Sequence, residues 1–439
     1  MRSDRVFSSR ARGTLVVPAA ATALLISGCG LAEVFTGDKV NPEVPSWYNR
    51  PSGSMAVFIH RDLTAPARAV GEDWERGRPE IDAAHDRVFV GSSDHGLYAL
   101  RAGDGSTLWR FETLNVVQSE PLYDGEMDYV YFGSNDGALY CVRASTGKLV
   151  YRFDTGAEVS KKPVRSGENL FFSNASDYLF SIDRRTGKAR WQAHRTPALG
   201  MEISGHSGAA LDPVSNLVYV AYSDGHVLAY DGRDGAEKWT PVDLSAEAEQ
   251  SAGEAPRYLD ADTTPVLDDH PQGRVVYVSS YAGGVFALDA ATGARVWSND
   301  KAIGVTDLIL WREGAHRPNP NGPDKDGPLV PERKLIIVSS ATFGLSGLDP
   351  YTGRVLWRNK VPEGGVTAPV AVAGAIMVGT SRYGIFLMSP RNGKVIDGMD
   401  LGTGFAQTPA AFGGRAYAMT NAGTFLGVSV APPLPLKRR

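Results

Sequence analysis

Short runs of apolar and β-branched residues, separated by glycine-containing turns, recur along most of the chain. In residues 88–109 an apolar run is followed by an Asp-His-Gly turn, a second apolar run, a turn that contains Gly105, and a third run that reaches Trp109. Residues 130–151 repeat this order and end in Tyr151. Apolar runs of this length bounded by turn residues predict β-strands joined as hairpins.

The same order returns at residues 170–191, 218–239, 276–297, 335–357 and 376–396, and in a shorter eighth copy at 416–430. A short strand precedes each copy, often with a proline near its start, as at Pro121 and Pro265. Each full copy therefore has four strands, and the turn glycines follow one another at intervals of 40 to 60 residues. This period predicts an all-β fold, an eight-bladed β-propeller of four-stranded antiparallel blades.

The eighth copy lacks a final aromatic strand, whereas an apolar segment at residues 55–60 belongs to no copy. We expect this N-terminal strand to pair with the last blade and close the ring, because closure protects the strand edges. The large aromatic residue that ends most copies, Trp109 in the first, is expected to pack between neighbouring blades.

The N-terminus has the pattern of an export signal. A start with four arginines precedes an apolar stretch at residues 15–26, which is too short to span a bilayer as a stable helix. The sequence Ile-Ser-Gly-Cys that ends at Cys29 resembles the lipobox of bacterial lipoproteins, which implies cleavage before Cys29 and its lipidation. A plain secretory signal is the alternative. We expect four segments: a lipoprotein signal peptide (1–28), a lipidated flexible tether (29–54), the propeller (55–430) and a disordered proline-rich, basic tail (431–439).

Composition narrows the possible functions. Of the 439 residues 43% are hydrophobic and 21% charged, and the net charge is −4, so the chain reads as folded and gives no sign of a nucleic-acid partner. Its two cysteines, Cys29 and Cys141, cannot form a disulfide framework or a four-thiolate metal site, and Cys141 is expected to be buried. The eight histidines show no metal-ligand spacing, so no metal site is predicted.

The stretch Asp-Ala-Ala-Thr-Gly-Ala-Arg-Val-Trp at residues 289–297 is similar to the pyrroloquinoline-quinone-type propeller repeat. With the lipobox and the chain length, it resembles the BamB family of outer-membrane-protein assembly factors over about residues 25–427. The resemblance implies a non-catalytic scaffold without a cofactor, lipid-anchored in the outer membrane and facing the periplasm. It also implies a monomer within a larger complex, whose partner is the periplasmic domain of a barrel-inserting protein like BamA.

The resemblance also indicates residues that contact the partner. The run Leu-Asp-Ala-Asp-Thr-Thr-Pro-Val at residues 259–266 is similar to one that opens a blade in this family and meets the partner, which implies contacts by Asp260, Asp262 and Thr263. A second contact loop matches residues 199–205, with Met201 and Ile203 at its apolar positions and a serine where the family has an arginine. From the residues alone, Asp262 could instead cap a turn through its side chain, and Met201 and Ile203 could simply pack within their own loop.

Two other classes of function stay open. A quinone-dependent dehydrogenase would need a buried cofactor, a divalent ion with oxygen ligands and a carboxylate base. The chain lacks the adjacent cysteines and the haem motif of the large dehydrogenases of this type, so no catalytic residue is predicted. A periplasmic lipoprotein that serves as a scaffold or ligand sensor outside barrel assembly is the other alternative. Two stretches that exceed the repeat, 240–257 and 312–331, are candidate binding surfaces.

Overall fold

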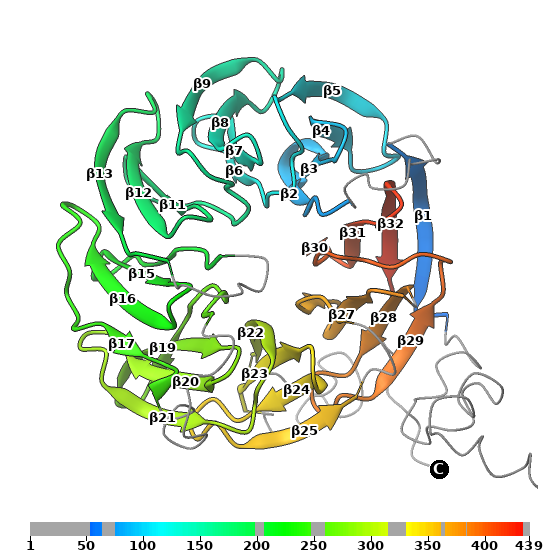
Figure 1. The fold of residues 1–439 in the computed structure, drawn as a ribbon. Helices are drawn as coiled ribbons and strands as arrows, with labels where there is room; N and C mark the ends of the chain where they lie inside the picture. The colour runs from blue at the N-terminus through cyan, green and yellow to red at the C-terminus, as the bar shows by residue number, and fades with distance from the viewer. Residues whose placement is uncertain are drawn as a thin grey trace, which may run out of the picture. The chain divides into compact units, whose positions relative to one another are not determined.

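The computed structural model describes residues 53–63, 75–197, 206–246, 260–314, 331–360, 365–382 and 384–432. These residues form eight four-stranded antiparallel sheets that surround a common axis as the blades of a propeller (Figure 1). The predicted eight-bladed all-β fold is therefore confirmed.

The strands of the first four blades follow one another from the axis to the rim. Blade 1 contains β2 (Glu80–Asp82), β3 (Arg87–Gly91), β4 (Gly96–Arg101) and β5 (Thr107–Glu112), with the 3-10 turn η2 (Ala83–His85) after β2. Blade 2 contains β6 (Leu122–Asp124), β7 (Tyr129–Ser134), β8 (Ala138–Arg143) and β9 (Leu149–Asp154). Blade 3 contains β10 (Val164–Ser166), β11 (Asn169–Ser173), β12 (Tyr178–Asp183) and β13 (Ala189–His194). Blade 4 contains β14 (Ala210–Asp212), β15 (Leu217–Ala221), β16 (His226–Asp231) and β17 (Val242–Asp243).

The last four blades repeat this order, except that the eighth takes its outermost strand from the N-terminus. Blade 5 contains β18 (Val266–His270), β19 (Gly273–Ser280), β20 (Gly284–Asp289) and β21 (Arg295–Asn299). Blade 6 contains β22 (Val305–Glu313), β23 (Arg333–Ser340), β24 (Gly344–Leu348) and β25 (Val355–Asn359). Blade 7 contains β26 (Val370–Val372), β27 (Ala375–Thr380), β28 (Gly384–Met388) and β29 (Val395–Met399). Blade 8 contains β30 (Ala410–Phe412), β31 (Arg415–Met419), β32 (Thr424–Val430) and β1 (Met55–Asp62).

The burial of each strand follows from its place in the blade. The second and third strands are buried on both faces, as β3 and β7 are along their whole length, because neighbouring blades cover them on either side. Their sequences are accordingly almost continuously apolar. The outermost strand β5 instead alternates between exposed and half-buried residues. The core is thus a ring of inter-blade layers, one between each pair of neighbours.

The aromatic residue at the end of most copies packs on the turn glycine of the next blade. The ring of Trp109 lies over Gly147, that of Trp191 over Gly235, and a Cβ at either glycine would come within 2.8 Å of the indole. Both glycines also have a positive φ, which other residues adopt at a cost. The Nε1 of Trp109 donates a hydrogen bond to the carbonyl of Ala144, 2.9 Å away. The expected packing of these aromatics between blades is confirmed.

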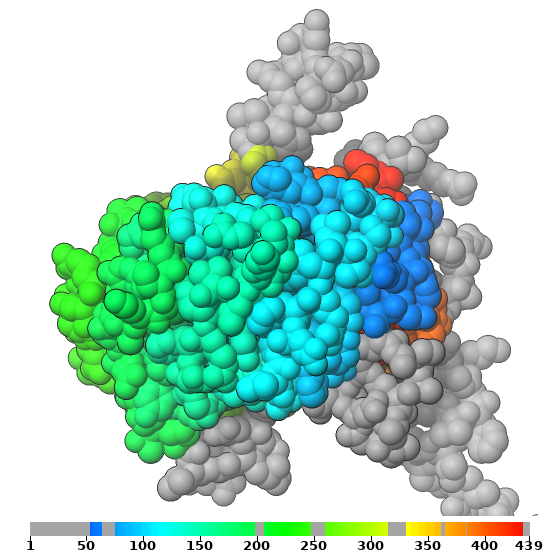
Figure 2. Space-filling model, turned by 90° about the horizontal axis from the view of Figure 1, so that it is seen from above, coloured from blue at the N-terminus to red at the C-terminus, as the bar shows by residue number. Residues whose placement is uncertain are grey.

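The two ends of the chain close the ring, as predicted. The strand β1 pairs antiparallel with β32 in a register that sets Met55 opposite Val430. Figure 2 shows the blue of β1 at the surface of the ring beside the first blade. We call the residue that packs on the turn glycine of the next blade the wedge. In blade 8 the wedge is Ile59 instead of an aromatic residue, since its Cγ2 lies 2.7 Å from where a Cβ of Gly105 would be. The amide of Met55 donates a hydrogen bond to Oδ2 of the buried Asp397, at 2.9 Å. Because Asp397 belongs to β29, blade 7 binds the start of β1.

Some predicted features lie outside the described residues, namely the signal peptide, nearly all of the tether, most of the tail, and the lipidation residue Cys29. Cys141 is buried in β8, and burial raises the pKa of its thiol. No helix in the described ranges is long and apolar enough to cross a membrane.

Candidate partner-binding face

One face of the ring carries two kinds of segment, which we call together the connecting face. One kind joins the outermost strand of a blade to the innermost strand of the next; the other is the turn between the second and third strands. Backbone hydrogen bonds link them, for example from the amide of Tyr281, in such a turn, to the carbonyl of Asp260, in such a connection, at 2.9 Å. The predicted contact residues Asp260, Asp262 and Thr263 therefore lie on the connecting face.

The three candidates in this run differ in exposure. Asp260 is 4% exposed and Thr263 1%, whereas Asp262 is intermediate. The Oγ1 of Thr263 accepts a hydrogen bond from the amide of Ser279 at 3.2 Å and so holds the connection against β19. Of the three predicted contact residues in this run, Asp262 thus offers the accessible side chain, and the other two are buried.

The hydrogen bond that the hydroxyl of Thr263 accepts from a backbone amide has counterparts in other blades. Ser119 accepts a hydrogen bond from the amide of Gly133 at 3.1 Å, and Thr367 accepts one from Gly379 at 2.9 Å. All three hydroxyl residues stand two positions before a proline, at Pro121, Pro265 and Pro369 in the order of the chain. This spacing was a signal in the sequence for a structural role of Thr263.

The second predicted contact loop falls outside the described residues, because Met201, Ile203 and Ser204 lie in the gap at 198–205. The chain resumes at His206, which is buried and approaches the Oγ of Ser160 with its Nδ1 at 3.4 Å. Burial, helped by the charge of Lys161, lowers the pKa of His206 to about 3. The residue that follows the loop is thus a neutral imidazole at the edge of the core.

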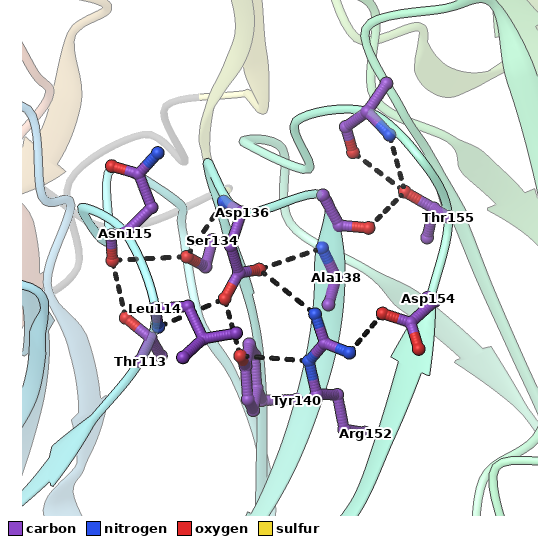
Figure 3. Close-up of polar contacts among 12 residues, drawn as sticks. Thr113, Leu114, Asn115, Ser134, Asp136, Ala138, Tyr140, Arg152, Asp154 and Thr155 are labelled. Atoms are coloured by element: carbon purple, nitrogen blue, oxygen red, sulfur yellow. Dashed lines mark hydrogen bonds and ion pairs between the residues drawn. The ribbon is translucent and has the colours of Figure 1, made fainter.

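A polar cluster on the connecting face of blade 2 was missed by the sequence analysis (Figure 3). Asp136, in the turn between β7 and β8, accepts hydrogen bonds from the hydroxyl of Tyr140 at 2.5 Å and from the amide of Leu114 at 3.2 Å. The Nε of Arg152, on β9, donates to the same tyrosine hydroxyl at 3.0 Å. The guanidinium also pairs with Asp154. The cluster fixes a partly exposed arginine beside the turn.

Blades 1 and 4 have related pairs. In blade 1, Arg110 lies 3.4 Å from Asp94, and burial with a hydrogen bond to Asp94 raises the pKa of Tyr98 to about 12. Arg195 forms an ion pair with Asp224, on the turn of blade 4. Burial opposes ionisation of Asp224, but hydrogen bonds from His226 and Arg195 outweigh it and lower its pKa to about 2.

These pairs give the connecting face a set of charged groups in fixed positions. Among the described residues, no group of three or more His, Cys, Asp or Glu side chains is placed to hold a metal ion.

Comparisons with known proteins match the chain to one family model and to several curated proteins. The family model described as "Outer membrane protein assembly factor BamB" matches residues 93–316 and 301–431. A curated protein with that description from Legionella pneumophila is 25% identical over 219 residues, which are 50% of this chain and 50% of that protein. A tetrathionate hydrolase from Acidithiobacillus ferrooxidans is 23% identical over 341 residues, 75% of this chain and 54% of that protein. The chain thus spans about half the length of these curated relatives.

The fold has a close counterpart among solved structures. The crystal structure of BamB from Moraxella catarrhalis matches with a TM-score of 0.64 and covers 85% of this chain and 99% of that chain. At 18% sequence identity the likeness establishes the fold alone.

Proposed function

Because the chain belongs to the family described as outer membrane protein assembly factor BamB, we propose that it is a non-catalytic scaffold of the machinery that inserts β-barrel proteins into the outer membrane. The observation that carries the proposal is the family match, which runs from residue 93 to residue 431 and so through all but the start of the propeller. The proposed partner is the periplasmic domain of the barrel-inserting protein.

The connecting face suits this role. A stable protein interface takes about 800 Å² from each partner, and a closed ring of eight blades offers a broad, rigid surface of this kind. We place the contact around Asp262, whose side chain is partly exposed where blade 5 begins. A carboxylate in the rim of such an interface guides a basic partner and fixes its orientation more than it adds affinity.

We further propose that the protein is anchored by a lipid on Cys29 to the periplasmic side of the outer membrane. The export pattern and the lipobox support this anchor. The strand β1 begins at Met55, 26 residues after Cys29, and 26 residues reach at most about 90 Å when fully extended. The anchor would therefore hold the ring near the membrane surface, where the proposed partner is inserted.

A pull-down from detergent-solubilised membranes tests the scaffold role. We expect the full-length protein to recover the barrel-inserting protein and Asp262→Lys to reduce that recovery about tenfold, which corresponds to about 1.4 kcal/mol of binding free energy. The matched control is Asp234→Lys, which reverses an exposed aspartate in the turn between β16 and β17, on the opposite face. Failure of the unaltered protein to recover the barrel-inserting protein would refute the proposed function. Equal recovery with Asp262→Lys would refute the proposed contact.

Two alternatives have their own outcomes. Recovery of other envelope proteins alone would favour a scaffold or sensor outside barrel assembly. An enzymatic role has support in the 341 residues that match the tetrathionate hydrolase. We expect the purified protein to consume no tetrathionate above the buffer blank, and turnover that depends on the protein would overturn the non-catalytic assignment.

A further inference from the structure

A cavity of about 320 Å³ lies on the axis of the ring. Its lining comes from residues that precede or begin the innermost strands of all eight blades, and we call it the axial cavity. Cavities that bind small molecules begin at about this volume. All of its charged side chains come from blades 1, 2, 3 and 6.

Four of the charges on or beside the axial cavity satisfy one another. Arg78 forms an ion pair with Glu120, with 2.7 Å between Nη1 and Oε2. Lys162 forms a second pair with Glu80 at 2.6 Å, and its Nζ also lies 3.8 Å from Glu120. Two cations and two anions from three neighbouring blades thus form a balanced network on one wall.

Four further charged residues line the same cavity: Arg76, which is exposed, Glu158, which has a contact of its own, and the half-buried Lys161 and Asp307. The carboxylate of Asp307, in β22 of blade 6, accepts a hydrogen bond from the amide of Leu308 at 2.8 Å. Neither Asp307 nor Lys161, in blade 3, forms an ion pair with any residue that the structure describes. Burial raises the pKa of Asp307, and the charges of Lys161 and Arg78 act against this rise from a distance.

An anion and a cation, both half-buried, therefore line one cavity from blades that stand three apart in the ring, without contact between them. Half-buried charges that lack an ionic partner have lost part of their hydration, so a molecule that pairs with both would be held by both. Such a molecule needs an acceptor group for Lys161 and a donor group for Asp307. A simple anion would leave Asp307 unpaired, and a neutral sugar would leave Lys161 unpaired.

We propose that the axial cavity binds a small carboxylic acid that also carries a hydroxyl or ammonium group. Lys161 binds the carboxylate of the ligand. Asp307 accepts the hydrogen bond from the hydroxyl or ammonium group at the other end. Hydroxy acids and amino acids share this chemistry. The proposal does not depend on the role in barrel assembly.

Isothermal titration of the full-length protein in detergent tests the site with four probes. D-gluconate and L-serine carry both groups, acetate carries the carboxylate alone, and glucose carries hydroxyls alone. We expect at least one of the first two probes to bind in a 1:1 ratio, and acetate and glucose to bind at least tenfold more weakly. Binding of serine without gluconate identifies an amino-acid site, and the reverse identifies a hydroxy-acid site.

Two substitutions then locate the site. Lys161→Met and Asp307→Asn keep the shape of each side chain and are each expected to weaken binding at least tenfold. The exposed neighbours Lys301 and Asp300 supply the matched controls, Lys301→Met and Asp300→Asn, which should leave affinity unchanged. Failure of both gluconate and serine to bind the unaltered protein more tightly than acetate would overturn the proposal. Affinity that survives both Lys161→Met and Asp307→Asn would also overturn it. Neither result would affect the pull-down of the barrel-inserting protein.

Discussion

At the scale of single residues, the interfaces between blades depend on glycines that accept a large side chain from the neighbour. Gly353 has a φ of +69° and leaves room for the ring of Trp297, whose Cε3 would lie 2.5 Å from an added Cβ. Gly402 has nearly the same φ, +67°, but faces open space. The two glycines therefore separate the effect of backbone conformation from the effect of packing.

Replacement of these glycines by alanine should have unequal effects. We expect Gly402→Ala to lower the free energy of unfolding by about 1–2 kcal/mol, the cost of a left-handed backbone with a Cβ. Gly353→Ala should lose a further ~1–3 kcal/mol, because the methyl group collides with the indole of Trp297. Urea unfolding followed by tryptophan fluorescence measures both. Equal losses would show that the wedge tolerates a methyl group.

The buried imidazole of His206 should make stability depend on pH. Its pKa is lowered from 6.5 to about 3, so between these pH values the unfolded chain binds a proton there that the folded chain does not. Its contribution to stability is therefore complete above pH 6.5 and falls by about 1.4 kcal/mol per pH unit on acidification. Relative to His206→Gln, the unaltered protein should lose stability with this slope between about pH 6 and pH 4.

Unfolding midpoints at several pH values measure this slope. The control His60→Gln changes an exposed histidine of β1 and should preserve the pH dependence of the unaltered protein. Parallel curves for the unaltered protein and His206→Gln would contradict the prediction.

The role of Asp260 and Thr263 could be read only in part from the sequence. The hydroxyl two residues before a proline marks Thr263 as structural, but the burial of Asp260 depends on the turn of its own blade at Tyr281. The cluster of Tyr140 and Arg152 requires the register of β8 and β9, in which these residues stand opposite each other. An apolar pattern predicts strands without their register, so such cross-strand clusters stay hidden.

At the scale of the strand, a bulge in the outermost strand aims the wedge residue into the next interface. In blade 1, Ala99 pairs with Trp109 and Leu100 with Thr107, so Leu108 is the extra residue, and it is exposed. A bulge bends and twists its strand and redirects the residue beside it. The bulge thus accounts both for the exposed leucine and for the orientation of the tryptophan.

The closing strand β1 uses the same device although its sequence belongs to no repeat. Val57 pairs with Val428 and Ile59 with Gly427, so Phe58 is the extra residue and Ile59 the wedge. The strand itself could be predicted because the eighth copy lacked an outer strand. The wedge could not be assigned, because an isoleucine here replaces the aromatic residue that marks the other copies.

Truncation of this wedge should weaken the closed ring. We expect Ile59→Ala to lower the free energy of unfolding by about 2–5 kcal/mol, the usual cost for a buried isoleucine. Val57→Ala in the same strand removes an exposed side chain and should cost about 0.5 kcal/mol or less. Denaturant midpoints compare the two variants. Similar losses would mean that Ile59 has no special role in closure.

At the scale of the whole molecule, the proposed anchor and the propeller should be separable. We expect Cys29→Ser to move the protein from the membrane pellet to the soluble periplasmic fraction, because the variant lacks the proposed acyl chains. The unfolding midpoint should stay unchanged, since the strands of the ring extend from Met55 to Val430. Retention of the variant in the pellet after a carbonate wash would show that another part of the chain binds the membrane.

Closure by β1 also sets the order in which the protein can mature. The strand β1, which is made before the other strands of the ring, pairs with β32, which is made after them, and the hydrogen bond from the Ser429 hydroxyl to the Ala56 carbonyl joins positions 373 residues apart. Blades 1 to 7 can form while synthesis continues, but the eighth must wait until β32 has been made. A product that terminates before β32 is therefore an open arc with unpaired edges, which makes it a natural target for quality-control proteases and a source of aggregation.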